Sequence, residues 1–166
     1  GLSIHSYLIR SGFNTSTMAG TALIGMYSKC GELIYSQRVF NEIDDKNLVS
    51  FTAMMTAYGQ HGKGKEAISI LHQMKLNNIT LDEGAFTCIL TACSHAGLVN
   101  KGREIFHQIH GKYNIKPVLA HYACLVDLLS RAGKLEEAYE IICGMAMKPS
   151  VGIWACFLSW CRVYGM

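Results

Sequence analysis

Three threonines occupy equivalent places in a recurring pattern, and their hydroxyl groups can donate and accept hydrogen bonds. Thr21, Thr52 and Thr87 each stand ten residues before a glycine that ends an apolar helical stretch. Threonine is a mediocre helix former because its branched side chain loses rotamer freedom in a helix. Its repetition at one phase indicates either a hydroxyl that faces a ligand, or a hydroxyl that bonds its own backbone and was copied by duplication.

Two further polar residues, Asn47 and Asp82, lie in loops that precede apolar helical stretches. An ionised Asp only accepts hydrogen bonds, whereas an Asn amide both donates and accepts. Both residue types are also common helix caps and turn residues, and taken alone they favour that interpretation. The chemistry open to all these side chains is recognition by hydrogen bonds.

Catalytic and metal-binding chemistry has little support in the sequence. The seven cysteines include no C-x-x-C pair of the kind that zinc sites use, and most lie in apolar runs, where we expect small buried side chains. The H-x-E and P-C-x-x-C strings of zinc-dependent base deaminases do not occur. His107 and His110 are one helical turn apart but have no evident third ligand. We expect no catalytic residue, metal or cofactor in this chain.

Composition excludes two classes of protein. A chain of 166 residues that is 50% hydrophobic is not disordered, and no apolar run approaches the ~18 residues that cross a bilayer. The net charge of +3 permits an acidic partner without proving one. Because the sequence starts at Gly1 inside a helical pattern, we expect it to be a fragment.

The elements that position the threonines repeat along the chain. The recurring glycines are 31, 35, 36 and 32 residues apart. An apolar helical stripe precedes each glycine and a second one follows it, so each unit reads as helix, turn, helix and polar loop. We therefore predict an all-α fold, an α-solenoid (right-handed superhelix) of stacked antiparallel helix hairpins with the first helices lining its inner side. The glycines are Gly31, Gly62, Gly97, Gly133 and Gly165.

A small residue recurs at one phase of the second helices, which predicts close approach between helices. These residues are Ser36, Ala67, Gly102 and Ala138.

The strings ALIGMYSKCGELIYSQRVF, ILTACSHAGLVNKGREIF and HYACLVDLLSRAGKLEEAYEII closely resemble plant pentatricopeptide repeat (PPR) proteins of the class that mixes repeat lengths. VGIWACFLSWCRVYG resembles the first extension motif of such proteins. The resemblance implies the tail of a truncated long repeat (1–16), a short repeat (17–47), a standard repeat (48–82), a long repeat (83–118), a terminal short repeat (119–150) and the start of the extension motif (151–166).

The resemblance implies sequence-specific binding of single-stranded RNA, one base per repeat, in a chloroplast or mitochondrion. The usual purpose in that class is to position a cytidine for C-to-U editing. Any deaminase would lie beyond residue 166 or arrive with editing-complex proteins, so we expect a non-enzyme with no membrane or small-molecule partner. The alternative is a tetratricopeptide-like scaffold that binds peptides.

In that family two side chains read each base, and a residue three positions earlier in each first helix stacks on it. The resemblance pairs Thr21 with Asn47 as an adenine reader and Thr52 with Asp82 as a guanine reader, which together select 5′-AG-3′. The other pairs, expected to contribute little, are Thr87 with Val118 and Ala123 with Ser150. The stacking positions are Met18, Val49, Gly84 and Ala120. Candidate contacts to the RNA backbone are Lys29, Lys63, Lys65, Lys101, Arg131 and Lys134.

Overall fold

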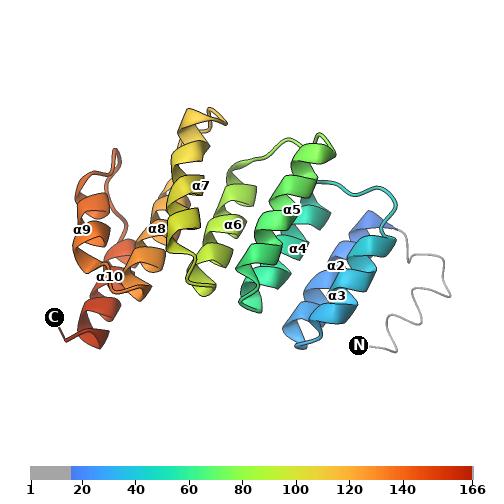
Figure 1. Cartoon of the computed structure of the whole chain (residues 1–166), viewed down its shortest axis with the longest axis horizontal. Helices are drawn as coiled ribbons and strands as arrows, with labels where there is room; N and C mark the ends of the chain where they lie inside the picture. The colour runs from blue at the N-terminus through green and yellow to red at the C-terminus, as the bar shows by residue number, and fades with distance from the viewer. Residues whose placement is uncertain (1–15, 166) are drawn as a thin grey trace. The chain divides into compact units, whose positions relative to one another are not determined.

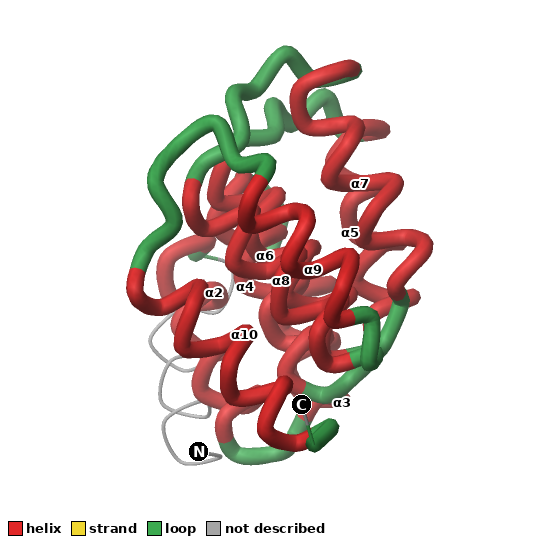
Figure 2. Tube along the Cα trace, turned by 90° about the vertical axis from the view of Figure 1, so that its left-hand side faces the viewer, coloured by secondary structure: helices red, strands yellow, loops and turns green. Residues whose placement is uncertain are grey.

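The computed structural model describes residues 16–165 (Figure 1). Residues 1–15, and with them nearly all of the predicted truncated repeat, lie outside the described residues. Within 16–165 the chain consists of helices joined by loops and turns, with no strand (Figure 2), as the hydrophobic period predicted. No helix in that range combines the length and the hydropathy needed to cross a bilayer. The chain divides into two compact units, one ending at Leu81 and the other starting at Asp82.

The first unit contains two helix hairpins in its described part. Each hairpin packs its two helices against one another, and α4 also packs against both helices of the preceding hairpin. The core between them includes Ile24, Phe51 and Met55, each at most 1% exposed. The helices are α2 (Thr17–Lys29), α3 (Leu33–Glu42), α4 (Leu48–Gln60) and α5 (Gly64–Leu76).

The second unit repeats this arrangement and adds a fifth helix. α8 lies between α6 and α10 in a layer of first helices, while α7 packs on α6 and α8, and α9 packs on α8 and α10. Its core includes Phe86, Leu90 and Val126, which are fully buried. The helices are α6 (Glu83–His95), α7 (Val99–Gly111), α8 (Leu119–Arg131), α9 (Leu135–Cys143) and α10 (Val151–Val163).

The recurring glycines end the first helices as predicted. All have φ between +65° and +84°, a left-handed conformation that glycine adopts without the steric cost of a Cβ atom. Except for the last, each of these glycines reverses the chain so that a second helix starts two residues later. They are Gly31, Gly62, Gly97, Gly133 and Gly165.

Variation in repeat length is confined to the second half of each hairpin. Every first helix has 13 residues, whereas the second helices have 10, 13, 13 and 9. The two longer second helices are followed by exits in which Asn78 and Asn114 take positive φ. The first helices therefore have the same length in every described repeat, and the repeats differ in length only after them.

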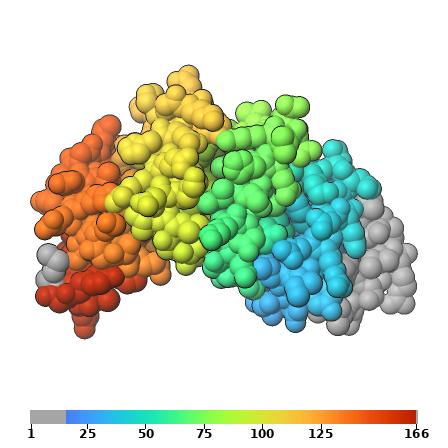
Figure 3. Space-filling model, in the orientation of Figure 1, coloured from blue at the N-terminus to red at the C-terminus, as the bar shows by residue number. Residues whose placement is uncertain are grey.

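Close approach between helices occurs where the sequence predicted it. A Cβ atom on Gly102 would lie 2.2 Å from Cδ2 of Leu128, so α7 and α8 approach too closely for a larger residue without rearrangement. The equivalent Ser36 is fully buried and donates a hydrogen bond to the carbonyl of Ile24 (3.0 Å). Side chains fill the spaces that the ribbons leave open within each unit (Figure 3).

Candidate nucleic-acid interface

A largely apolar pocket lies between the start of α2 and the start of α4. Its volume is about 470 Å³. The hydroxyl of Thr17 donates to the carbonyl of Asp45 (2.8 Å) and so ties the loop before α4 to the start of α2. The residues that line the pocket are Thr17, Met18, Thr21, Ala22, Asn47 and Val49. The set includes one predicted reader pair, Thr21 with Asn47, and two of the four predicted stacking residues, Met18 and Val49.

The threonine hydroxyls bond their own helices. Thr21 donates to the carbonyl of Thr17 (2.7 Å), Thr52 to that of Leu48 (2.9 Å), and Thr87 to that of Glu83 (2.9 Å). This is the backbone-bonding alternative that the sequence left open. It does not exclude recognition, because a hydroxyl that has donated its hydrogen keeps lone pairs that accept. All three side chains are partly exposed.

Asn47 and Asp82 cap helices, which was the other interpretation of these residues. Oδ1 of Asn47 accepts from the backbone N–H groups of Val49 and Ser50, both at 3.1 Å. Oδ1 of Asp82 accepts from the N–H of Ala85 at 2.7 Å. Each cap uses one atom of the side chain and holds that side chain in a single orientation.

The cap therefore decides which polar atom of each side chain is not used within the helix. For Asn47 that atom is Nδ2, a donor with no hydrogen-bond partner in the described part of the chain, and for Asp82 it is Oδ2, an acceptor. Sequence alone left the Asn47 amide able to donate or to accept.

The other two predicted reader pairs offer fewer polar side-chain atoms for recognition of a base. Ser150 caps α10 through a hydrogen bond from the N–H of Ile153 (3.4 Å), but Ala123 and Val118 have no polar side-chain atom. The N–H of Val118 instead donates to Nδ1 of the buried His121, whose other ring nitrogen contacts the carbonyl of Glu83 (2.8 Å).

The stacking positions differ sharply in the surface that they offer. Met18 is 83% exposed and Val49 is 59% exposed, so both present apolar surface that a flat ring could cover. Gly84 and Ala120 are exposed as well but offer little or no side chain. Large exposed apolar side chains at the predicted stacking positions are therefore confined to the first unit.

A polar cluster around Asp127 was not predicted. Its carboxylate accepts hydrogen bonds from Ser94 Oγ (2.5 Å) and Trp160 Nε1 (3.2 Å), and it pairs with Arg131 (3.2 Å). Burial opposes ionisation, but these donors and the Arg131 charge outweigh it and lower the pKa of Asp127. The available signal was a carboxylate inside the apolar string LVDLL, one helical turn after Ala123.

The cysteines are less buried than we expected. Cys93 is buried, Cys30 and Cys143 are exposed, and the other four are intermediate. The intermediate ones lie on first helices. Burial raises the pKa of Cys93 to about 11, while burial and the neighbouring Asp127 raise the pKa of Cys156 to about 11.

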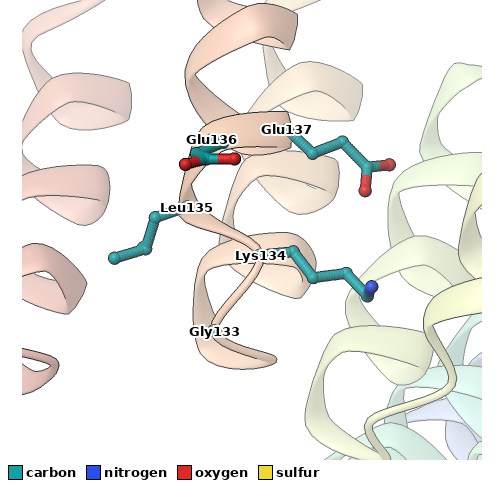
Figure 4. Close-up of a pocket in the computed structure, with 5 residues that line it drawn as sticks. All are labelled: Gly133, Lys134, Leu135, Glu136 and Glu137. Carbon is teal, nitrogen blue, oxygen red and sulfur yellow. The ribbon is translucent and has the colours of Figure 1, made fainter.

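A second hollow, of about 310 Å³, lies at the turn into α9 (Figure 4). It is lined by the turn and by the first residues of α9, with Lys134 and Glu137 extending to the same side and Glu136 lying apart from them. Two carboxylates make this hollow unsuited to a phosphate, and none of the predicted readers lines it.

Sequence models of PPR repeats match most of the chain. One, described as the PPR repeat family, matches residues 46–95. Another, described as a PPR repeat, matches residues 21–48, 84–113 and 120–148.

Curated relatives from Arabidopsis thaliana align along nearly the whole chain. A mitochondrial pentatricopeptide repeat-containing protein is 45% identical over 163 residues, which is 98% of this chain and 26% of that protein. The chloroplastic pentatricopeptide repeat-containing protein DOT4 is 42% identical over 164 residues, 99% of this chain and 19% of DOT4. The chain thus spans about a fifth to a quarter of the length of these relatives.

Solved structures share the fold. The crystal structure of the pentatricopeptide repeat protein PPR10 in complex with an 18-nt psaJ RNA element superposes with a TM-score of 0.81 at 18% identity, covering 91% of this chain and 23% of that one. PPR10 from maize gives 0.78 at 21% identity, covering 95% of this chain and 24% of that one. Together the repeat matches, the relatives and the fold show that this chain belongs to the pentatricopeptide repeat family.

Proposed function

We propose that this chain binds single-stranded RNA along its first helices and reads bases one per repeat, each repeat starting with a first helix. The observation that carries the proposal is the pocket of the first unit, which brings Thr21 and Asn47 together between the apolar side chains of Met18 and Val49. Apolar walls around a few fixed polar atoms suit a flat, hydrogen-bonding base. PPR10, a structural relative, is solved with an RNA element.

The hydrogen-bonding state of the first reader pair selects the base. Thr21 has donated its hydrogen to the backbone and can accept, while Asn47 has its oxygen in the cap and can donate. Adenine and cytosine each offer an exocyclic amino group that donates and a ring nitrogen that accepts. Uracil and guanine present a ring N–H, which opposes the Asn47 donor. The family preference of Thr for purines then favours adenine.

In the second proposed pair, Thr52 and Asp82 each keep an atom that can accept a hydrogen bond. The Thr52 hydroxyl donates to its own helix, and Oδ2 of Asp82 is left after the cap. Guanine supplies two neighbouring donors, a ring N–H and an amino group, whereas uracil supplies only a ring N–H. We therefore infer guanine at the second position, so the two bases read 5′-AG-3′.

The remaining pairs add little discrimination. Thr87 has only Val118 as its partner, and Ala123 has only Ser150; their stacking residues are Gly84 and Ala120. We infer that selectivity is concentrated in the first two bases.

The cellular role proposed for the whole protein is to position an organellar transcript for C-to-U editing. Curated relatives are named mitochondrial or chloroplastic, which supports an organelle. The chain acts as the RNA-binding module, and a deaminase domain or an editing-complex protein supplies the chemistry. Membership of the PPR family disfavours the alternative of a peptide-binding, tetratricopeptide-like scaffold.

Reciprocal substitutions test the reader assignment. Asn47→Asp replaces a donor by an acceptor and should move the first base from adenine toward guanine, while Asp82→Asn should move the second base from guanine toward adenine. Both residue types cap helices equally well, so folding should be unchanged. An unpaired polar group costs ~1–3 kcal/mol, so each preference should change about tenfold.

The assay is binding of the 166-residue chain to short RNAs in which the two adjacent bases vary at fixed low salt. Each variant serves as the control for the other, because only its own position should respond. If both preferences stay as in the wild type, the reader assignment is wrong. If acidic peptides compete for binding and RNA homopolymers do not, RNA binding itself is wrong.

A further inference from the structure

Two basic residues occupy the same place in different repeats. Lys29 follows the reader Thr21 by eight residues, and Arg131 follows Ala123 by eight. Eight residues advance a helix by about 12 Å, and each basic residue is the last residue of its first helix, α2 or α8. If RNA binds as proposed above, a basic side chain at this end of a first helix can contact the phosphates of the strand.

The two residues differ in their surroundings. Lys29 is exposed, and it has no ion pair with another described residue. Arg131 is paired with Asp127 through both carboxylate oxygens, at 3.2 and 3.4 Å, and its guanidinium lies over the ring of Trp160 at 5.0 Å. Its side chain is still 41% exposed, so the charge of Arg131 is balanced at the surface rather than hidden.

Asp127 is held firmly in its place. Ser94 on α6 and both Trp160 and Cys156 on α10 donate to its oxygens, so the carboxylate joins three neighbouring first helices. Burial opposes ionisation, but the hydrogen bonds from Ser94 and Trp160 and the charge of Arg131 lower the pKa of Asp127, so it stays ionised at neutral pH. A fixed anion one turn from Arg131 offsets the attraction of that cation for phosphate.

From this geometry, and on the basis of the proposed RNA binding, we propose that Asp127 masks Arg131 and so withholds the RNA backbone contact of the terminal repeat. Asp127 is then a positioning residue with two effects: it joins α6, α8 and α10, and it weakens the hold of this end of the reading face on RNA. Contact with the RNA backbone is left to repeats such as the first, in which Lys29 is unmasked.

A matched pair of substitutions tests the masking. Each phosphate contact to a single strand contributes roughly 0.7 to the slope of log affinity against log salt. Lys29→Gln should lower the slope by about that amount, whereas Arg131→Gln should leave it nearly unchanged. Both sites are exposed, so both variants should fold, as far-UV circular dichroism can verify. An equal decrease of the slope in both variants would show that Arg131 is not masked. An unchanged slope in both would show that these positions do not face the strand.

Removing the mask is the complementary experiment. Asp127→Asn should tighten RNA binding at low salt and steepen the slope, so that a fourfold rise in salt weakens the variant about 2.6-fold more than the wild type. The double variant Asp127→Asn with Arg131→Gln should lose that gain. The control is Glu140→Gln, which removes an equal charge from the exposed side of α9 and should not change the slope.

If Glu140→Gln steepens the salt slope as much as Asp127→Asn does, the effect comes from net charge alone and the masking proposal is wrong. If Asp127→Asn does not fold, the salt slopes of Lys29→Gln and Arg131→Gln still test whether Arg131 is masked. The base preferences of the Asn47 and Asp82 variants are measured independently, so a failure of masking is distinguishable from a failure of base reading.

Discussion

Gly102→Ala should destabilise the second unit because α7 and α8 meet at this glycine. The added Cβ would lie 2.2 Å from Leu128 Cδ2 and 3.5 Å from Cys93 Cβ, and the first distance is far inside van der Waals contact. Leu128 is 1% exposed, so it can move away only by disturbing its packed neighbours. Overpacking of this kind costs about 1–3 kcal/mol, while replacing a helical glycine regains at most about 1 kcal/mol. We expect a net loss of about 1–2 kcal/mol.

Thermal unfolding followed by tryptophan fluorescence measures this loss, because Trp154 and Trp160 both lie on α10 of the second unit. The expected decrease in midpoint temperature is about 4–8 °C per kcal/mol for a unit of this size. Gly111→Ala is the control: it lies on the same helix, and its added Cβ would have no neighbour within 4 Å. It should be neutral or slightly stabilising. If both variants shift stability in the same direction by the same amount, the close approach of α7 and α8 is not real.

Three further outcomes follow from the described side chains. Met18→Ala should leave thermal stability within about 0.5 kcal/mol, because Met18 is 83% exposed, yet weaken RNA binding about fivefold through lost stacking. Asp82→Ala should cost about 1 kcal/mol in urea unfolding through loss of the α6 cap, whereas Asp82→Asn should not. Iodoacetamide at pH 8 should label the exposed Cys30 and Cys143 first, because thiolate is the reactive form and the pKa of Cys93 and of Cys156 is about 11; labelling of those two should rise only as the pH approaches that value.

Local features of the sequence were sufficient to predict the hairpin and its repetition. A glycine that needs a left-handed φ marks each turn, and apolar residues three and four apart define each helix, so both can be recognised without knowing what packs where. The same phase analysis identified Thr21 and Thr52 as candidates. It could not decide what their hydroxyls do, because bonding to the backbone and facing a ligand require the same residue at the same place.

Tertiary structure decided which polar atoms remain available and which residues act together. Asn47 lines a pocket with Thr21 because α4 packs against α2, and the cap uses its amide oxygen and leaves the amide nitrogen without a hydrogen-bond partner among the described residues. Asp127 meets Ser94 and Trp160, each 33 residues away in sequence, only after α8 has packed between α6 and α10. A hydrogen-bond partner is selected by distance in space, and the local period of a helix carries no information about that distance.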